Sequence, residues 1–219
     1  MLVEIVSDLV CPWCYIGKRH FDGAVAMLRA EGVTTDITVQ LRAFQLDPGA
    51  PIGSPRPVRE AYAQRFGGDD RAARIMRHVT DAAATAGITF AMDRALRANT
   101  RGAHQVLKLV QQVSPELQTS VNESIMQAYF VEGRDISDPV TLDDCAVRAG
   151  FTTRRPSEHL GDSVARRTLD DAVDGDLRWA AERGITSVPT FVINEAFDIP
   201  GAQDAATFAR LLRRLADER

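Results

Sequence analysis

The chain has 219 residues, of which 45% are hydrophobic and 26% are charged, an ordinary composition for a globular protein with a full core. The formal net charge of −4 argues against nucleic acid or an anionic membrane as the main partner. No apolar run approaches the roughly 20 residues that span a bilayer, so we expect no membrane segment.

The chain begins with a β-α-β pattern. Residues 2–7 are an apolar run typical of a buried strand, and residues 11–31 place apolar side chains on one helical face before Gly32. Ile37, Val39 and Leu41 alternate with polar neighbours and predict a second strand. The strand-like start leaves no room for a signal peptide, so we expect a cytoplasmic protein.

Two cysteines stand at the first strand-to-helix junction, in the sequence Cys11-Pro12-Trp13-Cys14. Residues i and i+3 share a helix face, so the two sulfurs can come within bonding distance, and Pro12 suits the first helical turn. Cys11 would lie where backbone N–H groups and the helix dipole stabilise a thiolate. The motif predicts a nucleophilic Cys11 with Cys14 as its resolving partner, and in a reducing compartment their disulfide would be transient.

Two other interpretations of this cysteine pair stay open. A zinc site needs four ligands, and the sequence has neither a second CxxC nor a His-x-x-x-His pair, so we predict no metal. Two inert buried cysteines are the other alternative, although Pro-Trp between them is unusual for plain packing. The third cysteine, Cys145, is interpreted as a small buried hydrophobe in a helix capped by Thr141 and Asp144.

The middle of the chain is predicted to be almost wholly helical. Four prolines and two glycines within residues 47–57 mark a boundary. Beyond it, helical patterns cover residues 58–66, 69–86, 100–112, 115–131, 141–149 and 163–183.

Strand patterns return near the C-terminus. Residues 190–193 and 197–199 predict a hairpin, and a last helix carries apolar residues at helical spacing. The order β-α-β, helices, α-β-β-α, with CxxC at the first strand-to-helix turn, predicts an α/β protein with a thioredoxin-like fold. We assign residues 1–48 and 170–219 to the thioredoxin-like domain, and residues 49–169 to a large all-helical insertion domain.

Pro189 directly precedes the first strand of this hairpin. An X-Pro bond can be cis at a cost of only about 0.5–1 kcal/mol, and an ordinary trans proline is the alternative. Together with the CxxC and the hairpin, the position favours cis. We expect the backbone of Val188 to be free to pair with an extended substrate.

Several segments resemble the DsbA family, most closely its FrnE-like branch, over essentially the whole chain. They are residues 7–18, which contain the CPWC motif, Asn99-Thr100 with His104, residues 132–136, and residues 188–192. The resemblance implies a thioredoxin fold with a helical insertion and thiol–disulfide oxidoreductase or isomerase activity. It also implies that Cys11 is the nucleophile, Cys14 the resolving thiol and Pro189 the cis-proline.

Further site residues are predicted with their alternatives. Glu4, in the first strand, would relay the proton of Cys14 if it is buried there, and is otherwise a solvated edge residue. Asn99 and His104 match the family pattern and would border the substrate groove, or His104 is a hydrogen-bonded interdomain histidine. Trp13 is expected to be exposed and to stack on a substrate beside Pro12.

The leading hypothesis is a thiol–disulfide oxidoreductase or isomerase whose partner is a disulfide-bearing protein or a small-molecule thiol or disulfide. We expect no tightly bound cofactor, with glutathione or another low-molecular-weight thiol as the reductant. The related 2-hydroxychromene-2-carboxylate isomerases and kappa-class glutathione transferases suggest an alternative, a thiol-dependent isomerase or transferase for an aromatic or polyketide-like metabolite. A chaperone-like binding module is the non-enzymatic alternative, and a homodimer is left open.

Overall fold

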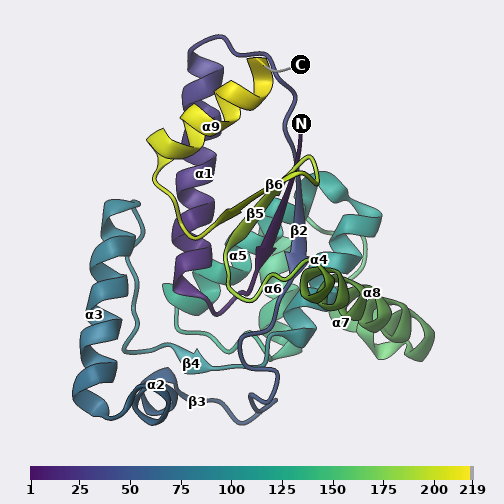
Figure 1. Ribbon diagram of the computed structural model, residues 1–219. Helices are drawn as coiled ribbons and strands as arrows, with labels where there is room; N and C mark the ends of the chain where they lie inside the picture. The colour runs from purple at the N-terminus through teal and green to yellow at the C-terminus, as the bar shows by residue number, and fades with distance from the viewer. Residues whose placement is uncertain (218–219) are drawn as a thin grey trace.

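The computed structural model describes residues 1–217 and contains a four-stranded sheet at its centre (Figure 1). The strand order is β2-β1-β5-β6, with β1 (Leu2–Ser7) parallel to β2 (Thr38–Ala43). Strand β5 (Thr190–Ile193) runs antiparallel to both β1 and β6 (Phe197–Pro200). The predicted strands and the C-terminal hairpin are confirmed.

Helices cover both faces of this sheet. On one face, α1 (Pro12–Ala30) packs beside α9 (Ala205–Asp217), and Phe21 of α1 stacks on Phe191 of β5 at a ring distance of 5.6 Å. On the other face, α8 (Ser163–Glu182) contributes Ala180 to a small apolar cluster with Val6 of β1. Successive side chains of β1 point to opposite faces, so Val3 and Ile5 enter the main core while Val6 enters the small cluster, and the strand is apolar on both sides. The structure therefore confirms the predicted thioredoxin-like arrangement.

The segment between β2 and α8 is mainly helical. Its helices are α2 (Val58–Phe66), α3 (Asp69–Thr85), α4 (Arg101–Val113), α5 (Gln118–Phe130), α6 (Pro139–Arg148) and α7 (Pro156–Gly161), with a 3₁₀ turn at Pro115–Leu117. Five of these six helices were predicted to within two residues, if the 3₁₀ turn is joined to α5. Helix α7 was missed, because its six residues are too few to show a helical period.

The prediction of an all-helical insertion needs correction. Strands β3 (Arg56–Pro57) and β4 (Leu96–Arg97) form a small antiparallel ribbon. Two residues are too few to show the alternation that marks a strand in a sequence. Helix α8 also runs across residue 170, where the thioredoxin-like domain was predicted to resume, so one helix serves both parts.

The start of α6 also differs from the prediction. Asp138 is the N-cap, and its side chain accepts hydrogen bonds from the backbone N–H groups of Val140 and Thr141. Thr141 and Asp144 are therefore not the capping pair. Pro139 occupies the first helical position, where its missing N–H costs nothing, so the helix begins two residues earlier than expected.

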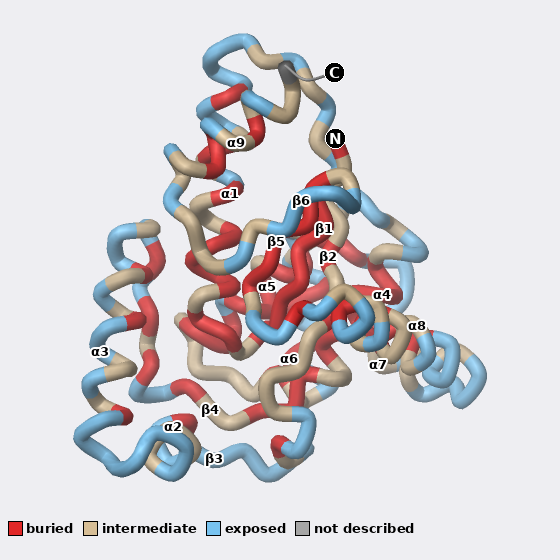
Figure 2. The backbone as a smooth tube through the Cα atoms, viewed as in Figure 1, coloured by how far each residue is buried: buried red, intermediate tan, exposed pale blue. Residues whose placement is uncertain are grey.

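The thioredoxin-like part and the helical segment share one hydrophobic core (Figure 2). Tyr15 of α1 packs on Phe90 and Phe130, with ring centroids 5.9 Å away in each case. Cys145 is fully buried in the same core, as predicted for a small hydrophobe. Among residues 1–217, the helices are too short or too polar to traverse a lipid bilayer.

Candidate active site

Cys11 is the N-cap of helix α1. Its backbone is extended, with φ −87° and ψ 113°, and Pro12 takes the first helical position as predicted. The N–H of Cys11 donates to the carbonyl of Asp8 at 3.1 Å, and the N–H of Cys14 donates to the carbonyl of Cys11 at 3.1 Å. The turn thus holds the two cysteines one helical turn apart at the positive end of the helix dipole.

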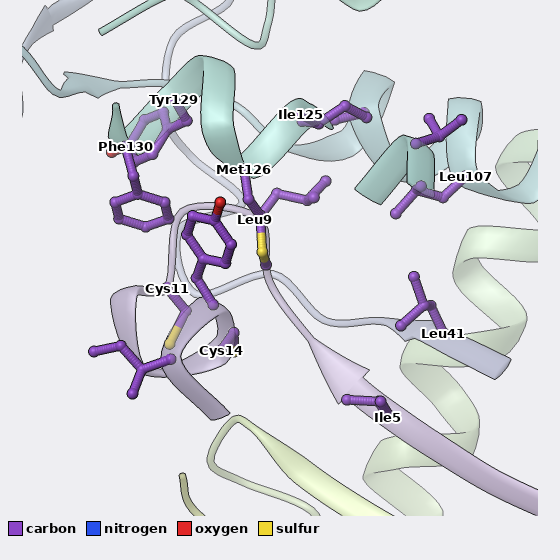
Figure 3. Packing of buried hydrophobic residues seen from close by; sticks show 14 of the residues in the cluster. Ile5, Leu9, Cys11, Cys14, Leu41, Leu107, Ile125, Met126, Tyr129 and Phe130 are labelled. Carbon is purple, nitrogen blue, oxygen red and sulfur yellow. The ribbon is translucent and has the colours of Figure 1, made fainter. Parts of the chain in front are cut away.

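Both thiols are free and shielded from solvent. Cys11 is 4% exposed and Cys14 is 1% exposed. Figure 3 shows Met126 and Phe130 of α5 near the turn that carries the two cysteines. Burial raises the pKa of the Cys14 thiol well above its ordinary value, and the neighbouring Cys11 raises it further.

The structure brings Pro189 to the cysteine pair. The Val188–Pro189 peptide bond is cis, as predicted. The Cys11 thiol donates to the Val188 carbonyl, with Sγ 3.7 Å from the oxygen, across 177 residues of sequence. Two distant segments therefore meet at one sulfur atom, which is the juxtaposition the predicted exchange chemistry requires.

Trp13 is only half-exposed, contrary to the prediction. It packs partly against the hydrophobic core, and its ring lies 5.6 Å from that of His78 on α3. The prediction failed because the helical segment folds back over the CPWC turn, and no local pattern in the sequence shows that cover. Stacking of Trp13 on a substrate stays a prediction.

Glu4 is buried, and it is not a solvated edge residue. It is 1% exposed and accepts from Nε of Arg42 at 2.8 Å. Arg42 also pairs with Asp176 of α8, which in turn pairs with Lys108 of α4. Burial lowers the pKa of Lys108, an effect that Asp176 opposes. These four side chains form a charged cluster beside β2, the edge strand of the sheet. A role for Glu4 in proton transfer stays a prediction.

Comparison with known proteins agrees with this geometry. The family model of the DSBA-like thioredoxin domain matches residues 2–213. The chain belongs to the DSBA-like thioredoxin family.

Several known proteins are similar to this DSBA-like chain over all or nearly all of its length. A probable DsbA oxidoreductase from Streptomyces coelicolor is 30% identical with a TM-score of 0.87, covering 100% of this chain and 91% of that one. The cytosolic disulfide reductase DsbM from Pseudomonas aeruginosa is 17% identical with a TM-score of 0.69, and the match covers 100% of both chains. The protein YwbO of Bacillus subtilis is 24% identical over 222 residues, covering 96% of this chain and 94% of YwbO.

In this DSBA-like fold, Asn99 and His104 hold loops in place and do not border an open groove. Asn99 is 8% exposed, and its amide nitrogen donates to the carbonyls of Pro48 and Ala50 at 3.1 and 2.9 Å. His104 is 3% exposed, and its Nε2 lies 2.9 Å from the Phe44 carbonyl. The interdomain alternative for His104 is the one the structure favours, because both residues are closed off from solvent.

Two further residues, which the sequence analysis did not single out, affect the cysteine pair. The Asp8 backbone and the Ser7 side chain lower the pKa of the Cys14 thiol, but burial outweighs their effect. Ser7 and Asp8 fall inside the segment on which the family resemblance rests. Their position directly before the CPWC turn is the signal that would have identified them.

The described residues contain no group of three or more His, Cys, Asp or Glu side chains arranged to hold a metal ion. The chemistry available at the site is that of two thiols, a backbone carbonyl and the buried polar groups behind them.

Proposed function

We propose that this DSBA-like protein is a thiol–disulfide oxidoreductase that works through Cys11 and Cys14. The Cys11 thiolate attacks one sulfur of a substrate disulfide and forms a mixed disulfide, and one substrate sulfur leaves as a thiolate. Cys14 then attacks Cys11, which releases the second substrate thiol and leaves a Cys11–Cys14 disulfide. The reverse sequence oxidises a dithiol.

The observation that carries this proposal is the position of the Cys11 sulfur. It lies at the first turn of α1, where the helix dipole favours an anion, and 3.7 Å from the Val188 carbonyl beside the cis Pro189. Cys14 follows one turn later and is more deeply buried than Cys11, which suits a resolving thiol. Proteins of this family are generally disulfide oxidoreductases, and the Streptomyces coelicolor relative is named a probable DsbA oxidoreductase.

We expect the substrate to lie against the half-buried Trp13 and Val188, since Pro12, which was also predicted to bind it, is buried. Since Cys11 is only 4% exposed, a small disulfide fits the closed site better than a bulky one, and a protein substrate would have to present an extended segment. Glutathione or another low-molecular-weight thiol is proposed as the reductant, with no tightly bound cofactor. A cytoplasmic location is part of this proposal. In that reducing compartment, we expect the protein to reduce or isomerise disulfides.

The enclosure of Cys11 also favours a second candidate. A thiol-dependent isomerase or transferase would bind its small substrate and its thiol in the same covered site, using Cys11 alone. Replacing Cys14 separates the two candidates, because only disulfide exchange needs a resolving thiol.

The test uses the reduced protein with glutathione disulfide as substrate. Wild type should form the Cys11–Cys14 disulfide, Cys14→Ser should accumulate a glutathione adduct on Cys11, and Cys11→Ser should form no adduct at neutral pH. Mass spectrometry of acid-quenched samples distinguishes these three products. The proposal is wrong if wild type never cycles between dithiol and disulfide in any glutathione buffer.

A further inference from the structure

Helix α3 lies beside the turn that carries the two cysteines. His78 of α3 is exposed, and its ring lies 5.6 Å from the ring of Trp13 at an angle of 56°. Trp13 stands between Cys11 and Cys14 in the sequence, in the first turn of α1. The side of α3 that carries His78 therefore borders the surface from which a substrate reaches Cys11.

Two arginines lie on the same side of α3 as His78. Arg74 is four residues before His78 and Arg71 is seven residues before it, and these spacings place side chains on one face of a helix. Both arginines are exposed. At a rise of about 1.5 Å per residue, the face from residue 71 to residue 78 extends over about 10 Å.

A third arginine joins this face where α2 and α3 meet (Figure 1). The guanidinium of Arg65 lies 5.7 Å from the centre of the Phe66 ring, and Nη1 of Arg71 donates to the Phe66 carbonyl at 3.3 Å. The Phe66 ring also meets the ring of Tyr62 edge-on at 5.5 Å, and Tyr62 packs against the core that contains Cys11. Helix α2 therefore extends the same surface on the other side of the corner.

The exposed cations of this surface form an arginine face, which consists of Arg65, Arg71 and Arg74. Within residues 1–217, none of the three forms an ion pair with a carboxylate. Asp69 and Asp70 lie in the first turn of α3, where the helix dipole favours them, and Asp69 pairs with Arg59 at 3.3 Å. Asp81 lines a separate groove together with Arg77. The planar guanidinium groups are thus available for carboxylates of a partner.

The charge of the whole chain predicts the opposite preference. Its formal net charge is −4, so long-range electrostatics alone would favour a basic partner. At physiological ionic strength, however, charges are screened beyond about 8 Å, so the arginines nearest the bound partner dominate. A preference for acidic substrates would therefore be the signature of the arginine face.

An extended peptide matches the length of this face. Cys11 is only 4% exposed, so a protein substrate has to present its cysteine in an extended segment beside Trp13. An extended chain advances about 3.3 Å per residue, so three residues span the distance of about 10 Å from residue 71 to residue 78. Acidic side chains a few positions from the substrate cysteine would then meet the guanidinium groups.

We propose that the arginine face binds an extended acidic segment of a protein substrate and so places its disulfide at Cys11. This inference rests on the proposed function, for which it names the substrate class. The arginines contact the substrate away from the reacting sulfurs, so the exchange step itself is unchanged. Their effect is on the rate at which Cys11 captures the substrate.

The experiment compares three peptides that differ only in charge. Each contains one cysteine, joined as a mixed disulfide to 2-mercaptoethanol and flanked on both sides by pairs of Glu, Gln or Lys. Reduced protein is mixed with each peptide at about 0.15 M salt, and mass spectrometry of acid-quenched samples measures the rate of dithiol oxidation. Each rate is divided by the rate at which dithiothreitol reduces the same peptide, which removes the effect of the flanking charges on the disulfide itself.

Wild type should favour the acidic peptide. We expect its normalised rate to be about tenfold higher for the acidic peptide than for the basic one, which corresponds to two or three exposed ion pairs. The difference should shrink at about 1 M salt, where the screening length is about 3 Å.

Charge-reversal variants locate the effect on the arginine face. Arg74→Glu should lower the acidic-to-basic ratio about tenfold, because an attraction becomes a repulsion. Arg77→Glu is the matched control, with the same change of charge on the same helix but in the separate groove, and it should change the ratio less than about threefold. Arg65→Glu on α2 should act like Arg74→Glu, and it serves as a second variant if Arg74→Glu fails to fold.

Four results would overturn the inference while leaving the proposed function intact. They are equal normalised rates for the acidic and basic peptides, faster reaction of the basic peptide, equal effects of Arg74→Glu and Arg77→Glu, and reaction of wild type with glutathione disulfide but with none of the peptides. Failure of wild type to react with glutathione disulfide or with any peptide would instead contradict the proposed function itself.

Discussion

Gly17 lies against the ring of Pro189. A Cβ built on Gly17 would be 3.1 Å from Cγ of Pro189 and 3.2 Å from Cα of Ala202. Both distances are shorter than ordinary carbon contacts, so only glycine allows α1 to approach the cis-proline loop this closely. Gly17 lies in the same helix as Cys11 and Cys14, and this contact sets the position of the loop relative to the Cys11 sulfur.

Replacing Gly17 should therefore disturb both stability and exchange. We expect Gly17→Ala to lower the free energy of unfolding by about 1–3 kcal/mol, since a methyl group would push backbone and ring atoms apart. Glutathione disulfide should also react more slowly with Cys11. Gly23→Ala is the matched control on the same helix, because its Cβ would lie 3.6 Å from Ala205, an ordinary contact. Urea unfolding measures the free energy of unfolding of both variants. Equal losses in Gly17→Ala and Gly23→Ala would contradict the prediction.

The burial of Cys14 predicts how its reactivity depends on pH. In Cys11→Ser, burial still raises the pKa of the Cys14 thiol. We expect iodoacetamide to alkylate Cys14 at least about 10-fold more slowly at pH 8 than in the unfolded protein, and the rate to keep rising above pH 9. Mapping of the alkylated peptide identifies the site, and alkylation at the unfolded rate would contradict the prediction.

The same shift links Cys14 to stability at alkaline pH. Because the pKa is raised in the folded state, the contribution of the neutral thiol is fully present below the unfolded value of about 8.5. It is lost as pH rises above that value, since the unfolded thiol ionises first. The free energy of unfolding should therefore fall less steeply above pH 8.5 in Cys14→Ser than in wild type. Parallel pH profiles would refute this.

Asp176 holds the buried charged cluster together. Its oxygens accept from Arg42, from Lys108 and from the N–H of Ala43. Asp176→Ala leaves the buried Lys108 without its carboxylate partner and leaves Arg42 with Glu4 alone, so we expect a loss of about 3–5 kcal/mol in the free energy of unfolding.

The control for Asp176 lies two residues away on the same helix. Asp174 pairs with Arg101 at the surface, and its side chain is 44% exposed. Asp174→Ala should cost less than about 1 kcal/mol, because solvent screens an exposed ion pair. Chemical denaturation of both variants measures the difference, and similar losses would show that burial does not govern this cluster.

The cap at Asp138 should make α6 sensitive to acid. Burial raises the pKa of this carboxyl, but the hydrogen bonds from Thr141 and Val140 outweigh that effect and lower the pKa overall. Asp138→Ala should cost about 1 kcal/mol near neutral pH. Since the pKa is lowered in the folded state, the stability that the charge contributes is present above the unfolded pKa and disappears as pH falls through the folded value.

Asp138→Asn separates the cap from the charge. Asparagine caps a helix about as well as aspartate but does not titrate, so this variant should lose less stability than Asp138→Ala and should show a flatter acid profile than wild type. Thermal unfolding between pH 2 and pH 7 provides the measurement. A steeper acid profile in Asp138→Asn than in wild type would contradict the assignment.

The sequence by itself determined the elements of this protein and the members of its reactive pair. An apolar run predicted β1, and the period of apolar residues predicted α1 and most later helices, because a helix buried on one face carries apolar residues every three to four positions. The reactive pair could be predicted from the Cys11–Cys14 spacing, and the cis bond from the position of Pro189 before a strand. Each of these features depends on only a few neighbouring residues.

Only the tertiary structure decided what surrounds the two sulfurs. Trp13 packs against His78 of α3, the Val188 carbonyl lies beside the Cys11 sulfur, and the buried Asp8 carboxylate lies beside His104 of α4. Strand alternation shows that Ser7 and Glu4 point in opposite directions, but it does not show which direction leads to α1. That choice depends on how helices distant in sequence pack against the sheet, so the burial of Cys14 was fixed by long-range contacts.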